Sequence, residues 1–186
     1  MTGERDDSVW VGGQPRHDGT IELVEWDPAW PVAFQREAAR IRAALGATVR
    51  RLEHAGSTSV PGLAAKPIID IVLAVPDSAD EAAYVPALEG AGYRLAVREP
   101  DWFEHRCLKA TDPAVNLHVF TEGSEEILRM LTFRDWLRTH PDDRDLYLRT
   151  KRELGARSWA FVQDYADAKG EVVEGILERA QAARDP

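Results

Sequence analysis

The chain has 186 residues, the usual length of one domain, and its 44% hydrophobic and 30% charged residues are typical of an ordinary globular protein. No apolar stretch approaches the ~20 residues that a membrane-spanning helix needs. The formal net charge of −9 opposes attraction to the phosphates of nucleic acid, so we expect neither a membrane nor a nucleic acid as a partner.

The first half of the chain predicts an arm followed by helix and strand. Residues 1–20, rich in Gly, Asp and Arg, predict a flexible N-terminal arm, and we expect the domain over 21–183. Asp27-Pro28 suits the start of a helix, and the alanine-rich run after it has high helix propensity. The apolar, β-branched run 68–75 is typical of a central strand covered on both faces. The predicted elements are a strand over 21–24, a helix over 30–45, and strands over 49–53 and 68–75.

The second half predicts further strands and then only helices. Residues 76–78 end the central strand and begin a helix that reaches about Gly90. The elements that follow are strands over 93–97, 103–108 and 115–120, and helices over 125–139, 142–154 and 158–183. Strands followed by helices predict an α/β core with a C-terminal helical subdomain that begins near residue 125.

A Gly/Ser-rich turn follows the second predicted strand. Gly56 lets the backbone approach a ligand closely, and the hydroxyls of Ser57 and Ser59 can donate to phosphate oxygens. The turn is therefore a candidate phosphate cradle. The alternative is an ordinary connecting loop that is held by its own hydrogen bonds.

Asp70 lies inside the apolar run 68–75, where an ionised carboxylate is costly unless it is paired or bound to a metal. Because strands alternate faces, Asp70 and Val72 share one face of the strand. The position predicts a metal ligand, and the alternative is a buried ion pair with an arginine.

Four segments of the chain resemble the GrpB family: IELVEWDPAW at 21–30, EHAGSTSVPGL at 53–63, KPIID at 66–70 and FRDWLR at 133–138. The resemblance extends over roughly 21–180. It implies a mixed sheet of nucleotidyltransferase type, as in the polymerase β superfamily, where a Gly-Ser turn holds nucleotide phosphates and strand carboxylates hold divalent metal. The family also occurs fused to dephospho-coenzyme A kinase, which hints at nucleotide or coenzyme A chemistry.

The sequence departs from the superfamily pattern at the second strand acid, where Val72 stands. The strand over 115–120 offers His118 where a third acid is sought, which favours one metal over two. An imidazole ligand biases the site toward Mn²⁺, Co²⁺ or Zn²⁺ rather than Mg²⁺. Glu104 could complete the site, but a regular strand turns only one of Glu104 and His105 toward it. The alternative for His118 is a core histidine bonded to backbone.

Four cations form a predicted basic set around the turn. Lys169, Arg134 and Lys151 fall on apolar helical stripes, so their charges point inward, and Lys66 lies four residues before Asp70. Inward cations need an anion, which the phosphates of a bound nucleotide would supply. The alternative is that their stems cover apolar surface while the charged ends reach water or carboxylates.

These features predict a metal-assisted nucleotidyltransferase-like enzyme that uses a nucleoside triphosphate and Mg²⁺ or Mn²⁺ to modify a small acceptor. Asp70 and His118 are the predicted metal ligands, with His118 or Glu104 as general base. The alternative is a non-catalytic nucleotide-sensing or accessory module. The lone Cys107 and the absence of an apolar targeting segment near the N-terminus predict a cytoplasmic location.

Overall fold

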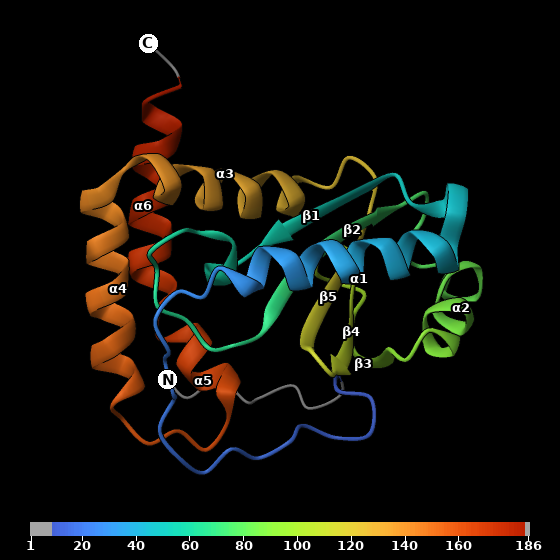
Figure 1. Ribbon diagram of the computed structural model, residues 1–186, viewed down its shortest axis with the longest axis horizontal. Coiled ribbons are helices and arrows are strands. Elements are labelled where there is room, and N and C mark those ends of the chain that lie inside the picture. Colours follow the sequence, from blue (N-terminus) through green and yellow to red (C-terminus); the bar gives the residue numbers. More distant parts are fainter. Residues whose placement is uncertain (1–8, 185–186) are drawn as a thin grey trace.

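The computed structural model describes residues 9–184, and within them a single five-stranded mixed sheet is the centre of the fold (Figure 1). The strand order is β1-β2-β5-β4-β3. β2 and β5 are parallel, whereas the other neighbouring pairs are antiparallel. The strands are β1 (Arg51–Ala55), β2 (Ile69–Val75), β3 (Arg94–Glu99), β4 (His105–Thr111) and β5 (Ala114–Thr121). The predicted α/β fold with a mixed sheet is confirmed.

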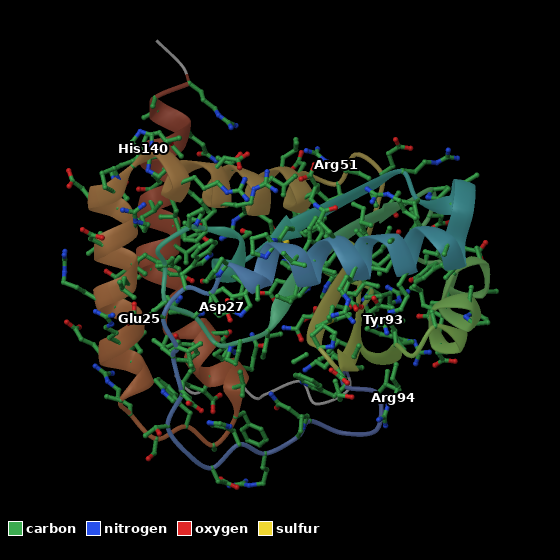
Figure 2. All side chains as sticks on the ribbon, viewed as in Figure 1. Glu25, Asp27, Arg51, Tyr93, Arg94 and His140 are labelled. Carbon is green, nitrogen blue, oxygen red and sulfur yellow. The ribbon has the colours of Figure 1, made fainter. Side chains whose placement is uncertain are left out.

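One face of the sheet is covered by α1 (Ala29–Leu45) and α2 (Val85–Gly90). α1 begins where predicted, because the Asp27 carboxylate accepts a hydrogen bond from the backbone N–H of Ala29 at 2.8 Å. Ile71 and Leu73 point from β2 into this layer and are fully buried. Tyr93, labelled in Figure 2, donates a hydrogen bond from its hydroxyl to the Glu37 carboxylate of α1, so this buried carboxylate has a partner.

The C-terminal helices gather on the side of the molecule opposite α2, where α4 and α6 stand side by side and α3 packs against both (Figure 1). α3 packs over Val72, Ala74 and Phe120 on the second face of the sheet. The helices are α3 (Glu125–Thr139), α4 (Pro141–Gly155), α5 (Val162–Asp167) and α6 (Gly170–Ala182). None of the helices within residues 9–184 has the length and apolar character that crossing a bilayer requires.

Three predicted elements differ from the structure. The strand over 21–24 is a single bridge from Val24 to Ala65, because this segment lies outside the sheet. The helix after 76–78 begins only at Val85, since Asp77 closes a local turn and Pro86 suits the first helical turn. The prediction of a single helix over 158–183 is wrong. The helix is interrupted at 168–169, between α5 and α6, next to Gly170, and glycine is unfavourable inside helices.

The described part of the predicted arm, residues 9–20, follows the edge strand and the α4–α5 connection. The N–H of Val11 donates to Ala96 of β3, and the N–H of His17 donates to Ala160. Figure 1 shows this dark blue segment passing below the sheet toward α5. Residues 1–8 of the predicted arm lie outside the described residues. The segment therefore forms one side of the cavity described next.

Candidate functional site

A cavity of about 740 Å³ lies between the sheet, the segment 9–14 and the C-terminal helices. That volume is in the range of small-molecule sites, about 300–1,000 Å³. Its floor is made by polar side chains from neighbouring strands, because the register places His118 beside Cys107, and Asn116 beside both Lys109 and Asp70. Side chains at paired positions share one face of a sheet, so the strands bring these groups together.

Asp70 lies at the centre of this floor, directly below the Gly-Ser turn. Its Oδ1 accepts a hydrogen bond from Asn116 Nδ2 at 2.9 Å. Gly56 has φ +62°, and a Cβ there would lie 2.2 Å from Asp70 Oδ2, so only glycine permits this approach. Burial raises the pKa of Asp70, but His118, Asn116 and Lys66 outweigh it and hold the pKa below its usual value. Among the described residues no arginine pairs with Asp70, which removes the predicted alternative of an arginine ion pair.

Two histidines connect Asp70 to a second carboxylate. His118 Nε2 lies 3.8 Å from Asp70 Oδ1, and its Nδ1 lies 3.0 Å from His105 Nε2. His105 Nδ1 lies 2.6 Å from Glu99 Oε2. Burial lowers the pKa of His105, although Glu99 opposes the shift. The alternative of His118 as a backbone-bonded core histidine is not what the structure has, because both ring nitrogens face side chains.

Glu104 is not part of this site. The chain turns just before β4, with Glu104 at φ +49° and its side chain exposed, while the neighbouring His105 faces the cavity. The Glu104 carbonyl accepts hydrogen bonds from Ser78 and Arg106, which fixes the turn. The prediction of Glu104 as a catalytic residue is therefore corrected: the strand alternation turns His105 inward instead.

A cationic corner lies where the turn after β1 meets α4, α5 and α6. Lys169 Nζ lies 4.5 Å from the ring centroid of Tyr165, and Lys66 Nζ lies 5.7 Å from the same centroid. Lys151 is 2% exposed and donates to the Ala64 carbonyl at 2.5 Å. Three of the four predicted cations, Lys66, Lys151 and Lys169, are thus brought together around Tyr165 and Tyr147.

Each of these ammonium groups is destabilised in its charged form. Burial, together with the charge of Lys169, lowers the pKa of Lys66 to about 8 and that of Lys151 to about 7. Burial also lowers the pKa of Lys169. Within the described part of the chain none of the three lies at ion-pair distance from a carboxylate. The buried hydroxyl of Tyr165, a residue only 1% exposed, also lacks a hydrogen-bond partner there.

Arg134, the fourth predicted cation, lies elsewhere. Its guanidinium donates to Glu53 at 3.0 Å, to the His54 carbonyl at 2.9 Å and to Asp135 at 2.7 Å. These contacts belong to a separate hollow of about 480 Å³ beside β1. The predicted role of Arg134 in binding phosphate in the same cavity is corrected, because carboxylates of its own chain already pair its charge.

The Gly-Ser turn also divides between the two hollows. Gly56 and Ser57 line the main cavity, whereas Ser59 lines the hollow beside β1. Ser59 Oγ donates to the Gly56 carbonyl at 2.6 Å, and its own carbonyl accepts from Arg138. Ser59 thus shapes the short 3₁₀ turn Ser57–Ser59, whereas Gly56, Ser57 and Thr58 line the main cavity.

The sequence analysis missed Glu99 and Lys109 as cavity residues and named His105 only as the alternative to Glu104. Alternation along β4 was the signal for two of them, since His105, Cys107 and Lys109 must share a face. Composition held a second signal. Of the 23 lysine and arginine residues of the chain only four are lysines, and all four line this cavity: Lys66, Lys109, Lys151 and Lys169.

Within residues 9–184 there is no group of three or more His, Cys, Asp or Glu side chains disposed to hold a metal ion. Asp70 and His118 offer two donors, and Val72 at the second acid position is fully buried under α3. Protein carboxylates often share a divalent ion with substrate phosphates and water, so the two donors fit an ion whose remaining ligands come from a bound molecule.

The fold and this site define an α/β protein with a nucleotidyltransferase-like arrangement, in which a Gly-Ser turn lies over a strand aspartate. The chain belongs to the GrpB family, whose model, described as GrpB protein, matches residues 20–179. The crystal structure of conserved protein GrpB from Enterococcus faecalis is similar, with a TM-score of 0.71 and 28% identity over 89% of this chain and 100% of that one.

Two curated relatives illustrate the range of the similarity. A UPF0157 protein of Halalkalibacterium halodurans is 57% identical over 181 residues, which is 97% of this chain and 93% of the relative. A protein named dephospho-CoA kinase from Mycolicibacterium paratuberculosis is 33% identical over 80% of this chain, but the match covers 43% of that relative. The similarity to the named kinase is therefore confined to part of its length.

Proposed function

We propose that the cavity binds the phosphates of a nucleotide and that the protein is a metal-assisted nucleotidyltransferase-like enzyme acting on a small-molecule acceptor. The observation that carries the proposal is the cationic corner, where the half-buried Lys66 and Lys169 line the cavity with no carboxylate at ion-pair distance among the described residues. Cations held close together without an anion are costly, and phosphate oxygens would satisfy them.

The position of Asp70 supports transfer chemistry beyond binding. Its carboxylate lies against Gly56 and next to Ser57, so a phosphate on the turn would lie within reach of an ion held by Asp70. A divalent ion, Mg²⁺ or Mn²⁺, would supply charge neutralisation at the reacting phosphate. The lysines would hold the remaining phosphate charge, and positioning of this kind provides most of the catalysis in phosphoryl transfer.

A second candidate function is a non-catalytic module that senses nucleotides or assists coenzyme A metabolism. The specific observation that favours it is Val72, whose burial under α3 leaves one strand carboxylate where transfer enzymes of this type present two. The relative named dephospho-CoA kinase supports a link to nucleotide or coenzyme A chemistry. In this case the lysines would bind phosphate without a reaction.

A thermal-shift screen of ATP, dephospho-coenzyme A and inorganic tripolyphosphate, each with and without Mn²⁺, tests the proposal. A ligand at about 100 times its Kd adds about 2.7 kcal/mol to the free energy of unfolding. We expect stabilisation by phosphate ligands, with a metal-dependent part that Asp70→Asn abolishes and that the exposed-carboxylate control Asp77→Asn retains. Metal-dependent release of pyrophosphate then separates the enzyme from the sensing module. Absence of stabilisation by every phosphate ligand would refute both functions.

A further inference from the structure

The chain of contacts Glu99–His105–His118–Asp70 crosses the four neighbouring strands β3, β4, β5 and β2 along the floor of the cavity. The first two contacts are hydrogen bonds, at 2.6 Å between Glu99 and His105 and at 3.0 Å between the two histidines. The last contact, from His118 Nε2 to Asp70 Oδ1, is 3.8 Å, which is too long for a hydrogen bond. His118 and Asp70 are therefore not hydrogen-bonded to each other, whereas Glu99–His105 and His105–His118 are.

The donors and acceptors along this chain can be assigned from Glu99. Ionised Glu99 only accepts, so His105 Nδ1 carries a proton and donates it. A neutral His105 then has a bare Nε2, which must accept, and His118 Nδ1 must be the donor between the two rings. This leaves Nε2 as the one ring nitrogen of His118 that can offer a lone pair to the cavity, where it faces a carboxylate oxygen that is also an acceptor.

We propose that Glu99 and His105 are positioning residues that hold the proton of His118 on Nδ1, so that its Nε2 and Asp70 Oδ1 form a two-ligand site for one borderline divalent cation such as Zn²⁺ or Co²⁺. Nε2 and Oδ1 attract each other only with a cation between them: a proton on Nε2 gives the ion pair with Asp70, and a divalent cation would take the place of that proton. Metal-ligating histidines commonly donate their second N–H to an outer partner in this way. The inference depends on the proposed function only for what the bound ion does.

Aromatic packing holds the rings of His105 and His118 in place. The His105 ring stacks on Phe120 with centroids 4.8 Å apart, and Trp102 meets its edge at 5.2 Å. His105 is buried and stacks on His118 at 5.2 Å, so the orientation of both rings is fixed before any ion arrives. Imidazole nitrogen suits borderline ions and is a poor ligand for Mg²⁺, so this two-ligand site should bind Zn²⁺ or Co²⁺ in preference to Mg²⁺.

The test is Zn²⁺ binding to the full chain, measured by competition with a chromophoric chelator in the absence of nucleotide. We expect Asp70→Asn and His118→Gln to remove the tightest site. Loss of an outer partner typically lowers metal affinity about 10–100-fold, so we expect that loss for Glu99→Ala. Glu99→Gln should restore part of the affinity, because its amide oxygen still accepts from His105. Glu104→Ala is the matched control, since Glu104 is one residue from His105 and lies outside the cavity.

A second measurement reports the tautomer directly. Nitrogen-15 NMR of the metal-free protein should show His118 protonated at Nδ1, and Glu99→Ala should mix the two tautomers. An Nε2-protonated neutral His118, or equal Zn²⁺ affinity for the variants at Glu99 and Glu104, would overturn the inference. Binding of metal-free tripolyphosphate depends on the lysines and should be the same in the Glu99 variants, so the proposed phosphate site can stand or fall separately.

Discussion

The cationic corner of the cavity and the hollow beside β1 hold charges of the same sign in opposite circumstances. In the hollow, Arg134 is met by Glu53, Asp135 and a backbone carbonyl. In the corner, Lys66 and Lys169 have only the face of Tyr165, with no carboxylate at ion-pair distance among the described residues. The charge of the arginine is therefore paired within the chain, whereas the lysines would be paired by the anion that the proposed function supplies.

The choice of residue follows the same division. Arginine keeps its charge and makes fixed forked hydrogen bonds, which suits a structural ion pair, whereas lysine is a compact charge on a flexible stem that can lose its proton when buried. The chain places its four lysines around the cavity and uses arginine for its other cations. A group of cations that stands close together without a ligand is expected to be made of lysines, because a lysine can lose its proton and so avoid an unpaired charge.

Among the substitutions, the largest effect on stability should come from removing Arg134, whose charge is paired within the chain. Arg134→Met should lower the free energy of unfolding by about 2–3 kcal/mol, because it leaves the His54 carbonyl without its partner and Glu53 with only the exposed Arg51. Affinity for tripolyphosphate should be unchanged. Chemical denaturation and isothermal titration measure the two quantities. Arg152→Met, which removes an exposed pair with Glu25, is the control and should cost about 0–1 kcal/mol. A loss of phosphate affinity in Arg134→Met would place this arginine back in the site.

Lys169→Met should lower the affinity for tripolyphosphate without lowering stability, the opposite of Arg134→Met. A hydrogen bond to a charged group contributes about 1.5–3 kcal/mol, so the affinity for tripolyphosphate should fall about 10–100-fold, while stability of the ligand-free protein is kept or increased. Lys169→Arg is the matched variant that keeps the charge, and we expect it to recover part of the affinity. If Lys169→Met instead lost stability and kept its affinity, the lysine would be a structural cation like Arg134.

Tyr165→Phe should produce a smaller change of the same kind. It removes a buried hydroxyl that has no partner among the described residues and keeps the ring under Lys66 and Lys169. We expect stability to be unchanged or slightly higher. Phosphate affinity should fall by about 1 kcal/mol, the usual net contribution of one hydrogen bond. Tyr147→Phe provides a comparison at the neighbouring ring, and unchanged phosphate affinity in Tyr165→Phe would show that the hydroxyl does not face the ligand.

The last prediction is a pH dependence of stability that reports on the cationic corner as a whole. The pKa values of Lys66 and Lys151 in the folded protein, about 8 and about 7, lie below the ordinary value of 10.5 in the unfolded chain. Between about pH 7 and pH 10.5 the unfolded chain therefore binds more protons, and the free energy of unfolding should rise with pH. Bound tripolyphosphate should reduce that slope, because it favours the charged lysines. Denaturation at several pH values measures this, and a stability that falls with pH through this window would contradict it.

Sequence periodicity predicted the parts of the fold that depend on neighbours in the chain. The bounds of α3 agree with the predicted helix over 125–139, and alternation along 115–120 placed Asn116 and His118 on one face. Periodicity failed where a long-range contact competes with a local pattern. The helical pattern over 158–183 continues through Lys169, yet the chain breaks there and the lysine enters the cavity.

The sequence by itself determined that Asp70 is a charge in a buried strand, that the glycine turn lies near it, and that several cations point inward. Only the tertiary structure decided which of those cations are already paired. Arg134 meets Glu53 across 81 residues of chain, and Lys66 meets Lys151 and Lys169 across a comparable separation. Local patterns fix the face on which a side chain lies, but its partners come from distant segments, and in this protein those partners separate structural cations from the cations of the proposed site.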